Sequence, residues 1–168
     1  MLISVGIDPG LTGAVVGLTS ERKLWRYFDQ PVLQETKTRK SLDIKATWDE
    51  LEAWTIAARA EGYDIRAVLE QCTPRPMQGL QAIVAMSRSV TLWEVTLTGL
   101  SIPYRVVMPA HWTRSALKGM RGEGKDRAIR RCNNEIPELP TKTERGRKIT
   151  GRSDAACLAL YGLEMVWK

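Results

Sequence analysis

Three acidic residues stand where the sequence pattern predicts that strands end or a helix begins. Asp8 follows an apolar run and precedes a Pro-Gly turn, Glu70 closes a second apolar run, and Asp154 lies in the first turn of a predicted helix. A carboxylate at the bend of a buried hairpin is costly to desolvate unless it is paired or bound to a cation. Asp8 is therefore the first candidate for chemistry, although an Asp-Pro-Gly turn by itself would also explain an acid there.

These three acids could meet at one edge of a sheet. Asp8 and Glu70 are expected to end neighbouring strands, and open α/β sheets gather ligands at one strand end. Carboxylates held together raise one another's pKa unless a cation neutralises them. An oxygen-rich site of this kind selects Mg²⁺ or Mn²⁺, and two such ions about 3.5–4 Å apart can cleave a phosphodiester. Alternatively, Glu70 is a surface acid and Asp154 interacts with the helix dipole. The joint occurrence of these two acids with Asp8 favours the metal site, in which two ions are expected.

The charge balance indicates what kind of substrate such a site would meet. The chain has 168 residues, with 25 Lys and Arg against 19 Asp and Glu, and a formal net charge of +6. A basic surface favours nucleic acid as the partner, although a merely soluble basic protein is also compatible with this charge. The length predicts a single domain over residues 1–168.

Cysteine usage and the first residues indicate the compartment. Cys72, Cys132 and Cys157 have no metal-binding spacing and are typical of reduced thiols in a cytosolic protein. The chain starts directly with a strand, and no apolar run is long enough to cross a bilayer. We therefore expect a cytoplasmic protein that does not contact the membrane.

Hydrophobic periodicity predicts an α/β fold. The first three strands should form an antiparallel meander, followed by alternating helices and strands around a mixed sheet. Thr47 is the expected cap of the first helix, and the helix at 80–99, apolar on more than one face, should be buried or pair with a partner subunit. His111 is expected in a loop, outside the site. Strands are predicted at 2–8, 11–18, 23–29, 65–70 and 104–108, helices at 43–61, 80–99, 126–134 and 153–166, and polar, basic connections at 34–40, 115–125 and 137–148.

Five motifs in order resemble the RuvC-like Holliday junction resolvases, and the phage and bacterial members look closest. The resemblance covers nearly the whole chain, and residues 21–40 and the basic loops match only loosely. The motifs are Gly6-Ile7-Asp8-Pro9-Gly10, Val68-Leu69-Glu70, Trp93-Glu94, the strand and turn at 104–112, and Gly151-Arg152-Ser153-Asp154-Ala155-Ala156.

This resemblance implies an RNase H-like fold and a Mg²⁺-dependent endonuclease. It further implies a homodimer whose two sites nick opposed strands of a four-way DNA junction, with the helix at 80–99 as the dimer face. By motif matching, Asp8, Glu70 and Asp154 become the catalytic metal ligands. The candidate DNA contacts are Arg75 and Met77 near the junction centre, together with Lys118, Arg121, Lys125, Lys148 and Arg152.

One position departs from the family pattern. These resolvases usually carry a fourth acid about one helical turn before the last one, where this chain has Thr150 and Gly151. Four explanations would each account for the change. The site could use three carboxylates, water and phosphate could complete the metal ligation, or an acid from elsewhere in the chain could take the place of the fourth. Alternatively, the substitution has weakened catalysis. Two other functions therefore stay open: a nuclease for branched or flapped DNA, and a non-catalytic junction-binding protein. Sugar kinases and actin-like ATPases share the opening motif, but they need a second such domain, for which this chain has no room.

Overall fold

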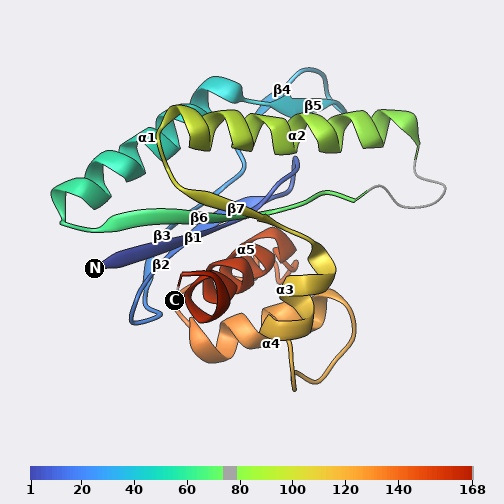
Figure 1. Ribbon diagram of the computed structural model, residues 1–168. Helices are drawn as coiled ribbons and strands as arrows, with labels where there is room; N and C mark the ends of the chain where they lie inside the picture. Colours follow the sequence, from blue (N-terminus) through green and yellow to red (C-terminus); the bar gives the residue numbers. More distant parts are fainter. Residues whose placement is uncertain (74–78, 168) are drawn as a thin grey trace.

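The computed structural model describes residues 1–73 and 79–167. Its main sheet has the strand order β3-β2-β1-β6-β7, with α1 and α2 on one face and α3, α4 and α5 on the other (Figure 1). The elements are β1 (Leu2–Asp8), β2 (Ala14–Thr19), β3 (Leu24–Asp29), β4 (Val32–Gln34), β5 (Lys40–Leu42), α1 (Ile44–Ala60), β6 (Asp64–Glu70), α2 (Leu80–Gly99), β7 (Tyr104–Val107), α3 (Pro109–Ala116), α4 (Lys125–Glu135), α5 (Thr150–Tyr161) and the π-helical turn η1 (Gly162–Val166).

The register of the sheet confirms the predicted mixed topology. Strands β1, β2 and β3 form the antiparallel meander, whereas β6 pairs in parallel with both β1 and β7. Ile7 is opposite Leu69 in the β1–β6 ladder, so the next residues, Asp8 and Glu70, leave the sheet at the same edge. The first two site candidates are therefore brought together by strand pairing.

Two hydrophobic cores cover the two faces of β1. Val5 and Ile7 pack with Trp93 and the α1–α2 layer, while the other face of the sheet packs against α5. Gly6 allows this second contact, because a Cβ there would collide with backbone atoms of Ala155 and Ala159. The close approach fixes the position of α5, and hence of Asp154, relative to β1.

The first helix is capped one turn earlier than predicted. Asp43 is the N-cap and accepts a hydrogen bond from the backbone N–H of Ala46 at 2.9 Å. Thr47, the predicted cap, is instead buried within the helix and its hydroxyl accepts a hydrogen bond from Gln30 at 2.8 Å. Gln30, the residue after β3, also accepts one from the indole of Trp93 at 3.1 Å, so a satisfied polar network joins the end of β3 to α1 and α2.

Three further sequence predictions need correction. The connection at 34–40 is the turn of a short hairpin, because β4 and β5 pair with each other outside the main sheet. His111 lies in α3 and not in a loop, since Pro109 starts a helix directly after β7. Helix α5 begins at Thr150, so Asp154 lies in its second turn and not at its positive end. No helix in the described ranges is long and apolar enough to cross a membrane.

Candidate active site

Three carboxylates converge at the carboxyl-terminal edge of β1 and β6. Asp8 and Glu70 leave adjacent parallel strands there, and α5 crosses the same edge with Asp154 on its buried side. Asp154 is 3% exposed, and Asp8 and Glu70 are half-buried. The structure thus brings together the three acids that the sequence singled out.

The electrostatics of the cluster follow from this crowding. Burial raises the pKa of Asp8 well above its ordinary value, and the charges of Asp154 and Glu70 raise it further. Burial also raises the pKa of Asp154, although the neighbouring Lys125 opposes the shift. Ionising Asp8 and Asp154 is therefore unfavourable in the protein alone, and an added cation would relieve the repulsion.

Lys125 supplies one positive charge to the cluster. Its ammonium, on the first residue of α4, donates a hydrogen bond to the Asp154 carboxylate. Burial would lower the pKa of Lys125, but the interaction with Asp154 outweighs it and the net pKa is raised. The lysine therefore stays charged, and the sequence had suggested it only as a DNA contact.

Trp112 fixes the orientation of Glu70. Its indole N–H, on α3, donates a hydrogen bond to Glu70 Oε1 at 2.8 Å, and the Trp112 residue is 3% exposed. Sequence reasoning missed this contact, because the two residues are 42 positions apart and only the packing of α3 against α5 and the sheet brings them together. The sequence feature that could have indicated this contact was a single tryptophan shortly after β7.

At one of the two positions for a fourth acid, residue 151, the backbone leaves no room for a side chain. A Cβ on Gly151 would collide with the backbone of Thr12 and Gly13, in the turn between β1 and β2. Helix α5 therefore packs directly on the turn that follows Asp8, and no carboxylate can be placed at residue 151. Thr150, the other position, is the first residue of α5.

The donor set fits a hard divalent cation by its chemistry. Three carboxylates face one ammonium, so the cluster has an excess of two negative charges when fully ionised, and all of its acidic donors are oxygens. Within the described residues, however, no three His, Cys, Asp or Glu side chains are arranged to hold a metal ion as they stand. Binding would require Asp8, Glu70 and Asp154 to close around the ion.

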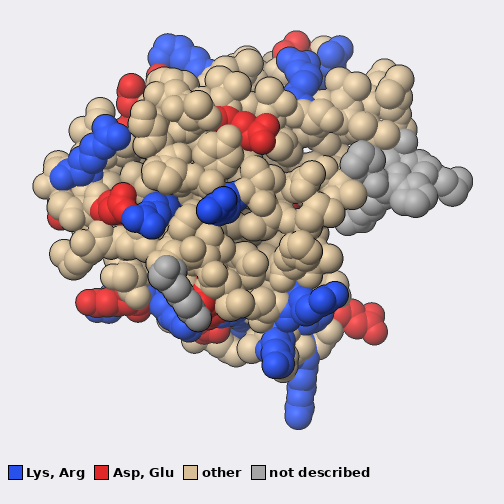
Figure 2. Space-filling model, viewed as in Figure 1, with Lys and Arg blue, Asp and Glu red and all other residues tan. Residues whose placement is uncertain are grey.

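The remaining predicted DNA contacts lie in different environments. Lys118 and Arg121 are exposed between α3 and α4, where Figure 2 shows Lys and Arg side chains gathered. Lys148 pairs with Asp126 at 2.6 Å. Arg75 and Met77 lie outside the described residues.

Arg152 has a structural role. Its guanidinium donates two hydrogen bonds to the Asp29 carboxylate, at 2.6 and 2.7 Å, and a third to the Pro140 carbonyl at 3.1 Å. It also lies over the Tyr27 ring, 4.8 Å from its centroid. Arg152 therefore ties α5 to β3. Because Asp29 and Pro140 accept hydrogen bonds from its guanidinium, fewer of its N–H donors are left for a phosphate.

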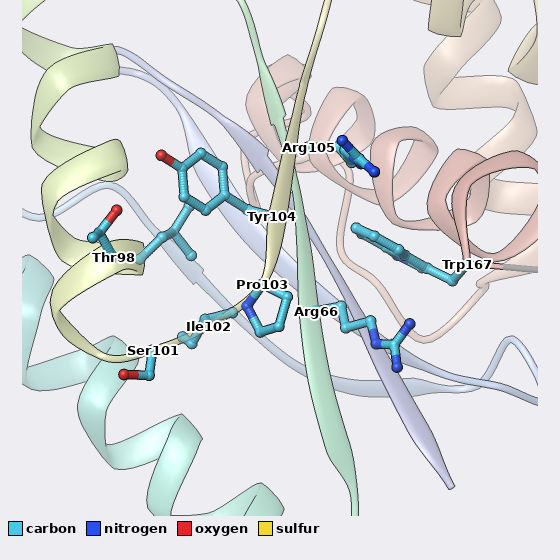
Figure 3. A pocket seen from close by; sticks show the side chains of 9 residues that line it. Arg66, Thr98, Ser101, Ile102, Pro103, Tyr104, Arg105 and Trp167 are labelled. Atoms are coloured by element: carbon cyan, nitrogen blue, oxygen red, sulfur yellow. The ribbon is translucent and has the colours of Figure 1, made fainter.

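A surface hollow of about 600 Å³ lies at the opposite end of β7 from the carboxylates. Figure 3 shows Arg105, Arg66 and the Trp167 indole along its wall. Arg66 is already engaged by Asp64 at 2.8 Å and lies 5.9 Å from the Trp167 ring centroid. The hollow contributes nothing to the acidic cluster.

The fold defined by this sheet order and helix arrangement is the RNase H-like α/β fold. Thermus thermophilus RuvC shares it: a structure of that protein in complex with Holliday junction substrate matches with a TM-score of 0.64 and 14% sequence identity, covering 95% of this chain and 92% of that chain. A second T. thermophilus RuvC structure matches with a TM-score of 0.56 and 16% identity over the same shares. No family model and no curated protein sequence matches the chain. The resemblance to RuvC is thus confirmed for the fold.

Proposed function

We propose that this protein is a divalent-metal-dependent DNA endonuclease that resolves four-way junctions by paired nicks. The observation that carries the proposal is the convergence of Asp8, Glu70 and Asp154 at one sheet edge of a RuvC-like fold. The net charge of +6 supports a polyanionic substrate. The structural neighbour bound to a Holliday junction substrate supports branched DNA within that class.

Each residue of the site has a distinct part in this proposal. Asp8, Glu70 and Asp154 would hold one or two Mg²⁺ or Mn²⁺ ions. A bound ion would polarise the scissile phosphate and lower the pKa of an attacking water. Trp112 keeps the Glu70 carboxylate directed by its hydrogen bond, and Lys125 neutralises part of the charge on Asp154. The apolar cores on both sides of β1 hold these groups in register.

A homodimer would place two such sites on one junction. Helix α2 carries apolar side chains that this chain leaves exposed: Leu80 is 76% exposed, Val84 49% and Val95 59%. Burying such residues against a second copy would stabilise the pair and match the two-fold symmetry of the substrate. The α2 face is therefore the proposed dimer interface.

A non-catalytic junction-binding protein is the second candidate. Two observations favour it: backbone packing at Gly151 leaves no room for an acidic side chain at that position, and Lys125 already provides a cation beside Asp154. Such a protein would keep the fold and the basic surface without cutting.

A cleavage assay distinguishes the candidates. Wild-type protein and Asp8→Asn are incubated with labelled four-way junction, fork and linear duplex, with Mg²⁺ or with EDTA. Paired nicks in the junction alone, dependent on Mg²⁺ and lost in Asp8→Asn, would support the proposal. Cleavage of forks as well would indicate a broader nuclease. Binding without cleavage would indicate the junction-binding protein.

A further inference from the structure

The connection between α4 and α5 forms an ordered turn, which we call the basic hairpin (residues 141–149). Lys142 and Lys148 are opposite each other in an antiparallel bridge. Beyond it, the backbone N–H of Thr143 donates to the Arg147 carbonyl at 2.9 Å. These hydrogen bonds fix the backbone, so the polar, basic connection expected from the sequence contains a paired segment.

The base of the basic hairpin is attached to the rest of the protein. Thr141 is 5% exposed, and its hydroxyl donates to Asn133 of α4 at 2.7 Å. Its carbonyl accepts from the N–H of Ile149 at 2.8 Å. Lys148 pairs with Asp126, next to Lys125 of the acidic cluster. The hairpin is therefore held in a defined place beside the candidate site.

The charge of this segment is concentrated and only partly compensated. Residues 142–148 carry four cations and one acid, all exposed. Within the part of the chain that the structure describes, no carboxylate forms an ion pair with Lys142, Arg145 or Arg147. Lys142 is also directly across from Lys148, and like charges in that position destabilise a strand pair. An anion bound at the hairpin would remove this repulsion.

The position of the hairpin indicates which anion this is. Ile149 is the N-cap of α5, and Asp154 follows five residues later, about 7.5 Å along the helix axis. Charges on one DNA strand are spaced by about 3.4 Å of helix rise. A strand that runs along α5 with its scissile phosphate at the acidic cluster would thus reach the base of the hairpin after about two nucleotides and pass the rest of the hairpin beyond that.

We propose that the basic hairpin binds the phosphate backbone of the DNA strand being cut, two to four nucleotides from the scissile bond. The inference rests on the proposed function, since it requires that DNA lie in the site. The paired segment 141–149 would then set the distance between the contacted phosphates and the nick. Arg145 and Arg147 are the side chains expected to contribute most, because they are exposed and have no carboxylate partner among the described residues.

A double substitution tests the hairpin. Arg145→Ala/Arg147→Ala is compared with wild type by fluorescence anisotropy on a labelled four-way junction, in EDTA, from 50 to 200 mM salt. Losing two phosphate contacts should weaken binding at least tenfold at 50 mM salt and reduce the slope of log K against log salt by about 1.8. The matched control, Lys37→Ala/Arg39→Ala, removes the same charge from the exposed turn between β4 and β5 and should leave the slope close to that of wild type.

A footprint locates the contact. With wild type, hydroxyl-radical cleavage should be reduced two to four nucleotides from the nick site, and this protection should vanish in the hairpin variant. Equal affinity, slope and footprint in wild type and the hairpin variant would overturn the inference while the nuclease proposal stands. A wild-type protein that does not bind the junction at all would overturn both. Thermal melting confirms that each variant is folded.

Discussion

Lys125 donates a hydrogen bond to Asp154, so a cation from α4 lies against the acid that α5 contributes to the candidate site. The pair joins the start of α4 to the second turn of α5, next to the turn that follows Asp8. Position 151 cannot carry a carboxylate, and the cluster holds an ammonium instead. The charge at this site is therefore less negative than four acids would make it.

Replacing this cation should destabilise the metal-free protein. Lys125→Ala leaves the buried Asp154 carboxylate without its charged donor, so we expect a loss of about 1–2 kcal/mol in the free energy of unfolding in EDTA. Urea unfolding measures it, with Lys118→Ala as the matched control for an exposed lysine. An unchanged midpoint would show that the ion pair contributes nothing in solution.

The raised pKa values predict a pH dependence of stability. The folded protein keeps protons on Asp8 and Asp154 at pH values where the unfolded chain has lost them. The free energy of unfolding should therefore fall as pH rises from about 4 through the raised pKa values. The pKa of Asp8 is raised more than that of Asp154, so Asp8→Asn removes the larger part of this pH dependence. The melting temperature of the variant in EDTA should decline less with pH than that of wild type, and should be the higher of the two at neutral pH. Parallel melting curves would contradict the charge cluster.

Divalent cations should stabilise the wild-type protein. A ligand that binds only the folded state at a hundredfold excess over its Kd adds about 2.7 kcal/mol. We expect Mg²⁺ or Mn²⁺ to raise the melting temperature of wild type and to raise that of Asp8→Asn much less, because one ligand is lost. Ca²⁺ and high NaCl are the controls for nonspecific screening. Equal shifts in both proteins would place the ion elsewhere.

The hydrogen bond from Trp112 to Glu70 predicts that a Trp112 variant loses cleavage activity while it keeps its fold. Trp112→Phe keeps most of the buried volume but removes the donor to Glu70, so cleavage should fall severalfold while the fold persists. Trp93→Phe removes an equivalent buried indole donor, to Gln30, on the opposite face of the sheet from Trp112, and should lower stability by about 1 kcal/mol without changing kcat. If both variants lose kcat equally, the contact with Glu70 has no special role.

The exposed α2 face predicts a dimer that a single charge disrupts. Val84→Asp should shift sedimentation from dimer to monomer at micromolar concentration, because a carboxylate would be buried in the apolar interface. Leu33→Asp, at an equally exposed apolar residue in β4, is the control. Wild-type protein that sediments as a monomer would contradict paired nicking by a dimer.

Local pattern was enough to predict the strands of the main sheet and most of the helices, and it singled out the three acids that the structure brings together. Alternating and continuous apolar runs identified β1, β2, β3 and β6, and the acids stood out because each closed or opened such a run. The same periodicity predicted the mixed sheet, since three strands in succession and then helix–strand alternation permit few other topologies. These features depend on residues that are close in sequence.

Contacts between distant segments decided the rest. The approach of Lys125 to Asp154, the support of Glu70 by Trp112 and the collision that keeps residue 151 a glycine each join segments at least 29 residues apart. Such contacts follow from how α3, α4 and α5 pack on the sheet, and no sequence period records that packing. The sequence therefore determined which acids could act together, and the tertiary structure decided which charges and donors surround them.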